Sequence, residues 1–325
     1  MASMKEKEKG PDPSLATRLG PLELRTPVIA ASGTYGYGIE FDNLSDFDYF
    51  GAITLKAVSI EPRKGNPYPR IVETPSGMLN TIGLENPGVE VFINEKLPEA
   101  AKLGVPLIAN LVGDQIDDYR KLAEILDSED SLAALEINGS CPNVERGYTA
   151  FAADAGTCSE LMGAVREVTS KPIIAKLSPN VGDIVPIAEA AYAAGANILN
   201  LGNTYLGMSI SIDDRRSRIS RDYGGLSGRA IRPLALRIVH QVASSIDIPL
   251  IGSGGIYDTG DAIEFLIAGA SVVSLGTVNF IQPNMARTIS EGISEYLSEK
   301  KMALADLVGS YLGPSACADS GNHLT

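Results

Sequence analysis

Short apolar runs alternate with longer segments of helical periodicity along most of this chain. Eight runs are rich in aliphatic and β-branched residues, and they occupy residues 26–32, 51–57, 105–112, 132–138, 171–178, 196–202, 248–255 and 271–277. Within each run the hydrophobicity is continuous rather than alternating, which is typical of strands that are buried on both faces. The pattern therefore predicts an α/β protein whose parallel sheet is covered by helices.

The segments between the runs carry signals that begin and end helices. Thr157 and Glu160 fit a capping box ahead of the apolar positions that follow them. Asp258 is a suitable N-cap for a later helix, and Gly269 is a typical residue just beyond that helix's end. Strands and helices are thus expected to alternate along the chain.

A repeated pattern within the runs indicates how the strands are arranged. A proline, three mostly apolar residues and a polar or basic residue recur in PLIAN (106–110), PIIAK (172–176) and PLIGS (249–253). These would be the third, fifth and seventh strands, and alternate strands of a barrel fill the same interior layer. Asn110, Lys176 and Ser253 are therefore expected to converge at one end. Eight strands and this repeat predict a (β/α)8 TIM barrel rather than an open sheet.

Two long connections and the N-terminus complete the predicted organisation. Residues 58–104 and 203–227 are rich in proline, glycine and polar residues, so we expect elaborated loops over the C-terminal face of the barrel. The charged residues 1–15 are interpreted as a flexible N-terminal tail. Residues 16–325 are predicted to form a single barrel domain.

Composition excludes several classes of function. The formal net charge of the 325 residues is −13, which argues against a nucleic-acid partner or an anionic membrane surface. The N-terminus carries no apolar segment long enough for a signal peptide or membrane span, and three cysteines are too few for a disulfide framework or a closed zinc site. We therefore expect a cytoplasmic protein without a metal. With only two histidines, histidine catalysis is not expected.

Glycine-rich turns after the last two predicted strands indicate a phosphate site. GSGGIYDTGD (252–261) follows the seventh strand, and LGT (275–277) ends the eighth. Barrels often bind phosphate there through backbone N–H groups, and Gly254 and Gly255 would allow the backbone to approach a ligand closely. Since no dinucleotide fingerprint or P-loop occurs in the sequence, a mononucleotide or sugar phosphate is favoured.

Two lysines lie at predicted strand ends, where an unpaired ammonium is costly. Lys56 and Lys176 could each stabilise a negatively charged cofactor or substrate. Lys176 could instead form a Schiff base, as in aldolases. The residues alone leave both roles open.

Cys141 lies in a polar loop just after the fourth predicted strand, in LEINGSCPNVERGY. A thiol there needs only a modest fall in pKa to act as a base or nucleophile. Cys158 and Cys317 are interpreted as small buried hydrophobes. Amide side chains are expected around the same rim, at Asn80, Asn110, Asn138, Asn143 and Asn203. They would suit a planar, amide-rich heterocycle.

Six motifs in order give the sequence a resemblance to a known family. They are ASGTYGYG, TLKAVSIEPRKGNPYPRIVETPSGMLNTIGLENPG, EINGSCPNV, GGLSGRAIRP, GSGGI and LGT. From about Leu19 to Val278 the chain resembles the catalytic subunit of dihydroorotate dehydrogenase, class 1B. The resemblance implies oxidation of (S)-dihydroorotate to orotate in pyrimidine biosynthesis, with FMN as the prosthetic group.

The resemblance also implies site residues. FMN would contact Ser32, Lys56, Ala57, Asn110, Asn138, Lys176, Gly202, Gly228, Gly254, Gly255, Gly276 and Thr277. Substrate would be held by Lys56, Asn80, Thr81, Ile82, Gly83, Leu84, Asn138, Asn143, Asn203 and Thr204. Lys176 would face the N1/C2 edge of the flavin. Cys141 would be the general base for the C5 proton of dihydroorotate, while the C6 hydride passes to flavin N5.

Relatives of this class pair with a second subunit that carries FAD and an iron–sulfur cluster and passes electrons to NAD. A homodimer at the core of a heterotetramer is therefore expected. Three alternatives remain from the residues: an FMN-dependent pyrimidine reductase acting on dihydrouracil-like substrates, a Schiff-base aldolase that uses Lys176, and a catalytically silent barrel that acts as a binding subunit.

Overall fold

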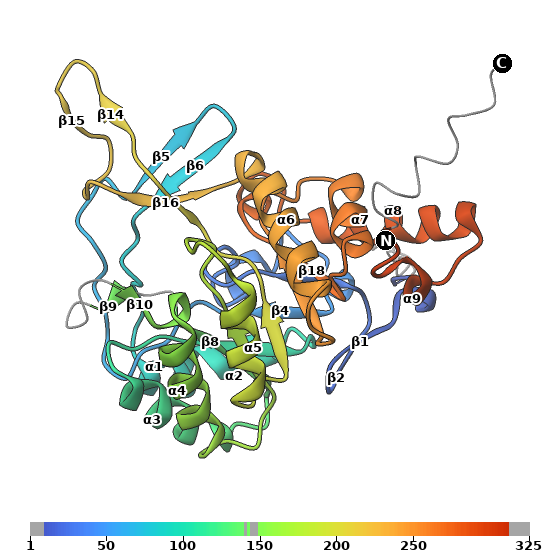
Figure 1. Ribbon diagram of the computed structural model, residues 1–325, viewed down its shortest axis with the longest axis horizontal. Helices are drawn as coiled ribbons and strands as arrows, with labels where there is room; N and C mark the ends of the chain where they lie inside the picture. Colours follow the sequence, from blue (N-terminus) through green and yellow to red (C-terminus); the bar gives the residue numbers. More distant parts are fainter. Residues whose placement is uncertain (1–9, 140–141, 144–148, 312–325) are drawn as a thin grey trace, which may run out of the picture.

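Eight parallel strands close into a barrel in the computed structural model, which describes residues 10–139, 142–143 and 149–311 (Figure 1). In barrel order they are β3 (Val28–Ala30), β4 (Ala52–Thr54), β7 (Leu107–Leu111), β8 (Leu132–Asn138), β11 (Ile173–Lys176), β12 (Ile198–Asn200), β17 (Leu250–Ser253) and β18 (Val272–Leu275). Each lies inside one of the eight predicted runs, and β18 pairs with β3 to close the barrel. The predicted (β/α)8 fold is confirmed.

Helices alternate with these strands and surround the barrel (Figure 1). The longer ones are α3 (Ile116–Asp127), α4 (Ala155–Arg166), α5 (Val185–Ala193), α6 (Arg232–Ala243), α7 (Thr259–Ile267) and α8 (Met285–Lys300), followed by the short α9 (Leu304–Leu307). Short 3-10 helices lie at Pro13–Leu15, Ile39–Phe41, Phe47–Tyr49, Phe151–Ala153, Arg229–Ile231 and Thr277–Phe280.

The predicted helix boundaries hold for α7 and shift for α4. Asp258 is the N-cap of α7 and accepts a hydrogen bond from the backbone N–H of Asp261 at 2.9 Å. The capping box predicted at Thr157 is wrong, because α4 begins a turn earlier. Its N-cap is Asp154, whose carboxylate accepts from the Thr157 backbone N–H at 2.9 Å.

The barrel interior changes from apolar to polar towards the C-terminal ends of the strands. One apolar cluster combines inward residues of all eight strands with the hairpin of β1 (Thr17–Leu19) and β2 (Leu22–Leu24), whose leucines close the other end. In each strand, the side chain two residues further along points into the barrel again. There the interior side chains are buried and polar, and they include Asn110, Glu136, Lys176, Asn200, Ser253 and Ser274. The polar layer thus faces the end at which barrel sites form.

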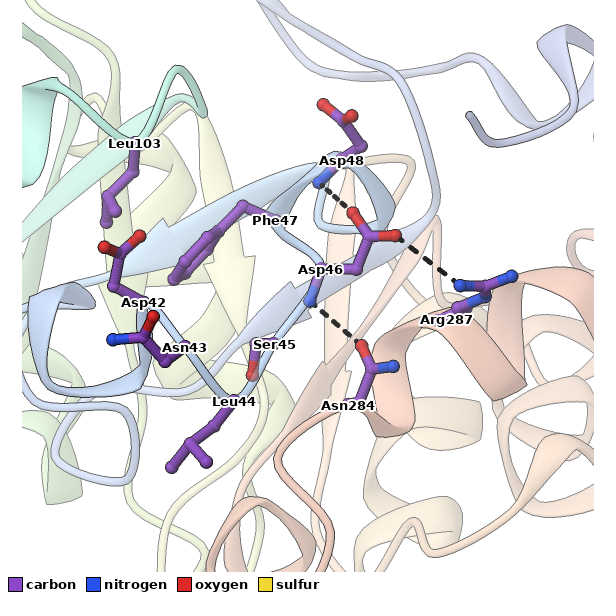
Figure 2. A pocket seen from close by; sticks show the side chains of 10 residues that line it. All are labelled: Asp42, Asn43, Leu44, Ser45, Asp46, Phe47, Asp48, Leu103, Asn284 and Arg287. Carbon is purple, nitrogen blue, oxygen red and sulfur yellow. Dashed lines mark hydrogen bonds and ion pairs between the residues drawn. The ribbon is translucent and has the colours of Figure 1, made fainter. Parts of the chain in front are cut away.

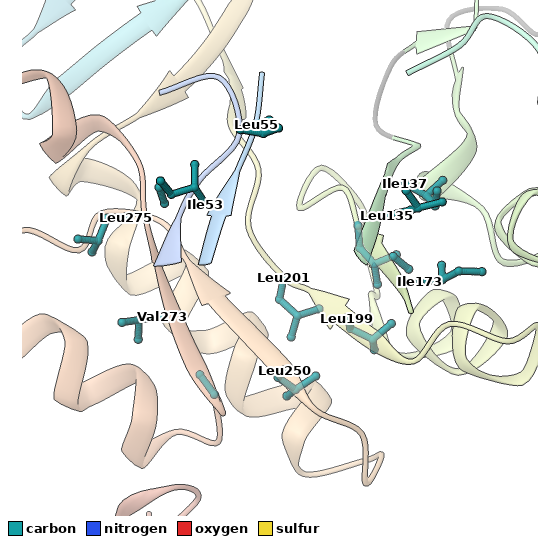
Figure 3. Close-up of a cluster of buried hydrophobic side chains, with 14 of the residues drawn as sticks. Ile53, Leu55, Leu135, Ile137, Ile173, Leu199, Leu201, Leu250, Val273 and Leu275 are labelled. Carbon is teal, nitrogen blue, oxygen red and sulfur yellow. The ribbon is translucent and has the colours of Figure 1, made fainter. Parts of the chain in front are cut away.

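The outward residues of the same strands form the second core, between the sheet and the helices. Figure 3 shows Leu135 and Ile137 of β8, Leu199 of β12 and Val273 of β18 within this cluster. All four side chains are fully excluded from solvent. Strand residues buried on both faces explain the continuous hydrophobicity of the runs.

The two long connections meet over the barrel, and they are more regular than loops. They contribute β5 (Ile71–Thr74), β6 (Gly77–Asn80), β13 (Tyr205–Gly207) and β16 (Gly224–Ser227). These strands form one antiparallel sheet in the order β13-β16-β6-β5. The hairpin of β14 (Ile210–Ser211) and β15 (Arg216–Ser217) projects beyond it (Figure 1). A further short antiparallel pair joins β9 (Pro142–Asn143) and β10 (Thr149–Ala150).

Part of the first connection is helical, which corrects the prediction of a loop through residue 104. The helical segment consists of α1 (Val89–Val91), a π-helical turn (Phe92–Lys96) and α2 (Leu97–Ala101). Buried residues at Val89, Phe92, Leu97 and Ala100 follow a helical spacing. The segment supplies the helix between β4 and β7.

The packed part of the chain begins earlier than the boundary predicted at residue 15. Leu15 is buried in the main core, and the Asp12 carboxylate accepts a hydrogen bond from Ser294 Oγ at 2.6 Å. Residues 1–9 lie outside the described residues, so a tail there stays a prediction. Across the described chain, no helix combines the length and apolarity needed to cross a membrane.

Candidate active site

A cavity of about 520 Å³ lies between the C-terminal ends of the barrel strands and the antiparallel sheet above them. Most residues predicted for cofactor binding line it: Ser32, Lys56, Ala57, Asn138, Lys176, Gly202, Gly228, Gly254, Gly255, Gly276 and Thr277. The lining also includes the predicted substrate residues Asn80, Thr81, Ile82, Leu84, Asn203 and Thr204. Residues that are far apart in sequence are thus brought to one place.

The glycine turns after β17 and β18 lie side by side in this lining. Gly254 and Gly255 have φ of +128° and +77°, and a Cβ at Gly255 would lie 2.7 Å from the backbone nitrogen of Arg232. Only glycine fits such a close approach of two backbones. Thr277, from the second turn, donates a hydrogen bond to Ser227 Oγ at 2.8 Å. Both predicted phosphate turns therefore line the same cavity, where each follows one of two paired strands.

A buried network of charges and amides lies at the end of the barrel interior. Glu136 accepts hydrogen bonds from Asn110 Nδ2 at 2.5 Å and from Asn200 Nδ2 at 2.6 Å. The Lys176 ammonium nitrogen lies 3.5 Å from a Glu136 oxygen, and the two side chains are 9% and 1% exposed. Of the expected trio, Lys176 and Ser253 line the cavity, whereas Asn110 is fully buried beside Glu136.

Glu136 and Asn200 were not among the residues predicted for the site. A signal was present, since Glu136 is a charged residue inside the otherwise apolar run LAALEIN. Asn200 pairs in register with Lys176, and Asn110 with Glu136. These four side chains share one layer of the barrel because of the strand register, and the apolar runs in the sequence do not specify that register.

The second lysine lies at the rim. Lys56 Nζ is 3.9 Å from Glu85 Oε2, and the same oxygen accepts a hydrogen bond from Arg70 at 2.9 Å. The Lys56 side chain is 31% exposed. Its backbone is fixed by a hydrogen bond from Lys56 N–H to the Gly36 carbonyl at 2.8 Å. A partly exposed cation at this position can meet an anionic ligand.

The remaining predicted residues are placed differently. Gly83 lies between two lining residues without lining the cavity itself. Asn143 belongs to β9, which is described only as backbone. Cys141 lies outside the described residues, so its predicted role is a proposal from sequence.

Several buried polar atoms near the cavity have no protein partner within the described chain. They are Asn138 Oδ1, Asn110 Oδ1 and Ser274 Oγ. A buried polar atom without a hydrogen bond is costly, so a ligand with a matching donor would satisfy Asn138 Oδ1, since Asn138 lines the cavity. Together with two lysines and the paired glycine turns, this amide fits a planar, polar heterocycle that carries a phosphate. In the described residues, no cluster of three or more His, Cys, Asp or Glu side chains is placed to hold a metal ion.

Cys158, which lies within the described residues, is a poor nucleophile. Cys158 lies in α4 with its side chain fully buried. Burial raises the pKa of its thiol to about 12, so the thiolate is scarce near neutral pH. The expectation that Cys158 is a small buried hydrophobe is met.

A second hollow, of about 540 Å³, lies away from the barrel mouth between residues 42–48 and α8 (Figure 2). Several of its polar groups pair with one another. The Asp46 backbone N–H donates to Asn284 Oδ1 at 3.0 Å, and an Asp46 oxygen lies 3.9 Å from Arg287. Asn284 and Arg287, the lining residues at α8, thus both contact Asp46, and we assign the hollow no ligand.

Comparison with known proteins agrees with this geometry. A sequence model of the family described as dihydroorotate dehydrogenase matches residues 14–297. The chain is 48% identical over 298 residues to the dihydroorotate dehydrogenase B (NAD(+)) catalytic subunit of Geotalea daltonii, covering 91% of this chain and 98% of that protein. It is 46% identical over 296 residues to the subunit of the same name from Phocaeicola vulgatus, with coverage of 91% and 98%.

A solved structure shares the fold. The structure described as DHODH in complex with ferulenol from Eimeria tenella superposes with a TM-score of 0.75. The superposition covers 94% of this chain and 90% of that chain, at 22% sequence identity. The two proteins therefore share the barrel fold.

Proposed function

Because this chain belongs to the dihydroorotate dehydrogenase family, we propose that it is the catalytic subunit of an NAD-linked dihydroorotate dehydrogenase B, which oxidises (S)-dihydroorotate to orotate. The observation that carries this proposal is the cavity at the barrel mouth. It gathers two lysines, several amides and two glycine turns, which are the residue types needed for an anionic pyrimidine beside a phosphorylated cofactor.

The cofactor is FMN, which would accept the C6 hydride of dihydroorotate when bound. The phosphate would be held by the turns at Gly254/Gly255 and Gly276/Thr277. Lys176 would supply a positive charge at one edge of the ring, where it favours the reduced, negatively charged form. Asn138 would offer an amide from the end of β8.

Lys56 would bind the carboxylate of the substrate, since its ammonium is partly exposed at the rim. The amides of Asn80 and Asn203 lie in the same lining and would hydrogen-bond to the pyrimidine carbonyl and N–H groups. Cys141 would take the C5 proton as the general base. This role comes from the motif EINGSCPNV.

The proposal extends to partners and location. The relatives from Geotalea daltonii and Phocaeicola vulgatus are named catalytic subunits, which implies that this chain also works with another subunit. That subunit would carry FAD and an iron–sulfur cluster. Two copies of this chain would form the core of a cytoplasmic heterotetramer.

The first test is the visible absorption spectrum of the purified protein, before and after anaerobic addition of dihydroorotate. We expect a flavin spectrum that bleaches, because the substrate delivers two electrons to the cofactor. A flavin spectrum that does not bleach would support FMN as the cofactor and indicate that the substrate is another reduced pyrimidine. Protein that stays colourless after incubation with FMN would overturn the proposal, and borohydride trapping with a carbonyl compound would then test Lys176 as a Schiff base.

A further inference from the structure

A buried carboxylate lies beside the cavity-lining Lys176, on the inner face of β8. Glu136 has a side chain that is 1% exposed. Its Oε1 accepts from Asn110 Nδ2, its Oε2 accepts from Asn200 Nδ2, and Lys176 Nζ lies 3.5 Å from Oε1. Among the described residues, every polar partner of this carboxylate is a donor.

The carboxylate fixes the direction of two amides. A carboxylate offers acceptors only, so both asparagines turn their NH2 groups towards Glu136 and their carbonyl oxygens away. The Asn200 oxygen accepts from the N–H of Gly202 at 3.1 Å, and Gly202 lines the cavity. The Asn110 oxygen is buried and has no partner in the described part of the chain. Glu136 thereby determines that Asn110 offers an acceptor.

Stability alone does not account for a charge pair at this depth. Two residues earlier in the same strands, Ala134 and Ile174 point inward and fill the barrel with apolar side chains. Replacing a buried ion pair by well-packed apolar residues is often neutral or stabilising. A barrel could therefore be filled at this layer without Glu136.

We propose that Glu136 is a positioning residue of the cofactor site: it holds the Lys176 ammonium where this group meets the flavin ring, and it counters part of the lysine's charge. This inference rests on FMN being the cofactor. The countercharge limits how strongly Lys176 favours the reduced, negatively charged flavin over the oxidised one.

The test compares the affinity of the protein for reduced FMN with its affinity for oxidised FMN. Glu136→Gln keeps the size of the side chain and removes its charge. The ratio of affinities for reduced and oxidised FMN should rise about tenfold, the order expected when a unit charge is removed at side-chain distance inside a protein. For a two-electron couple this is about 30 mV in midpoint potential. Equilibration with reference dyes measures the potential, and Glu99→Gln, at an exposed helix position, is the matched control.

A double-mutant cycle shows whether Glu136 acts through Lys176. The same change in a Lys176→Met background should alter the ratio by less than it does in wild type, because only the direct repulsion between the carboxylate and the reduced ring is then left to remove. An equal effect of Glu136→Gln in both backgrounds would contradict the proposal. So would an unchanged ratio accompanied by lower thermal stability, since that is the result of a merely structural role.

Two further outcomes are kept separate. If Glu136→Gln does not fold, Glu136→Asp takes its place: it keeps the charge but withdraws it by one methylene, and the ratio should rise about two- to threefold. An unchanged ratio in that variant would overturn the inference. Wild-type protein that binds neither redox state of FMN would instead overturn the proposed function itself.

Discussion

The ammonium of Lys56 lies 3.9 Å from the carboxylate of Glu85 at the rim of the cavity. Glu85 also binds Arg70 at 2.9 Å, so the carboxylate keeps a cationic partner when Lys56 turns away. Both members of the Lys56–Glu85 pair are partly exposed, and pairs of this kind contribute only about 0–1 kcal/mol. An anionic ligand can therefore take over Lys56 at little cost.

Lys56→Met should weaken binding of orotate by about tenfold to a hundredfold. A hydrogen bond to a charged group contributes about 1.5–3 kcal/mol, and the substitution removes it. The change in the flavin spectrum on titration with orotate measures the affinity. Lys102→Met, which removes an exposed lysine paired with Glu99, should leave the affinity unchanged. Equal affinities in the Lys56 variant and wild type would remove Lys56 from the substrate site.

Cys141→Ala should retain FMN and lose nearly all turnover with dihydroorotate. The base would be absent, and general-base catalysis typically contributes 10²–10⁴-fold. Cys141→Ser should turn over more slowly than wild type near pH 7, because a hydroxyl is a far poorer base. Steady-state rates with an artificial electron acceptor measure both. Cys158→Ala removes a buried thiol and should leave turnover per bound FMN unchanged. Wild-type turnover by Cys141→Ala would disprove the assignment.

Gly255→Ala should weaken FMN binding by at least about tenfold. The φ of +77° costs an L-residue about 1–2 kcal/mol, and the new Cβ would lie 2.7 Å from the Arg232 backbone nitrogen. Fluorescence titration of the apoprotein with FMN measures the affinity. Gly163→Ala is the control, because a Cβ there meets nothing within 4 Å. Inside α4 it should raise the free energy of unfolding by about 0.5–1 kcal/mol without changing FMN affinity.

Asp127→Asn should lower the free energy of unfolding by about 1–2 kcal/mol at pH 7. Asp127 ends α3 and accepts hydrogen bonds from Thr169 Oγ1 at 2.6 Å and from Ser170 N–H at 2.7 Å. These donors, the Thr169 hydroxyl first, lower the pKa of the carboxyl. Its contribution is therefore present above the unfolded pKa of about 3.9 and is lost as pH falls through the lower folded pKa.

Urea unfolding at pH 7 and pH 3 tests this dependence. The difference between Asp127→Asn and wild type should shrink at the lower pH, while the exposed Asp130→Asn should stay within about 0.5 kcal/mol of wild type at both. A difference that is the same at both pH values would show that the ionised carboxylate is not what joins α3 to the turn before β11.

Local patterns in the sequence determined the strands, the barrel and much of the site. Each buried strand lies within a predicted run because a parallel barrel strand is apolar on both faces, and that signal is local. The turns at Gly254 and Gly276 were also predicted, since glycine marks close backbone approach wherever it follows such a strand. The convergence of Lys176 and Ser253 was predicted because they end the fifth and seventh strands, and alternate strands fill the same interior layer of a barrel.

Tertiary structure alone decided which residues complete the site. A strand that is hydrophobic on both faces does not reveal which of its side chains point inward. The contact of Glu136 with Asn110 and Asn200 could therefore not be predicted before the register of β8 with its neighbours was known. The sheet above the cavity pairs β6 with β16, and no local period encodes a pairing between segments so far apart in sequence. The sequence specifies which residues can carry the chemistry, whereas strand register and long-range pairing determine which of them meet.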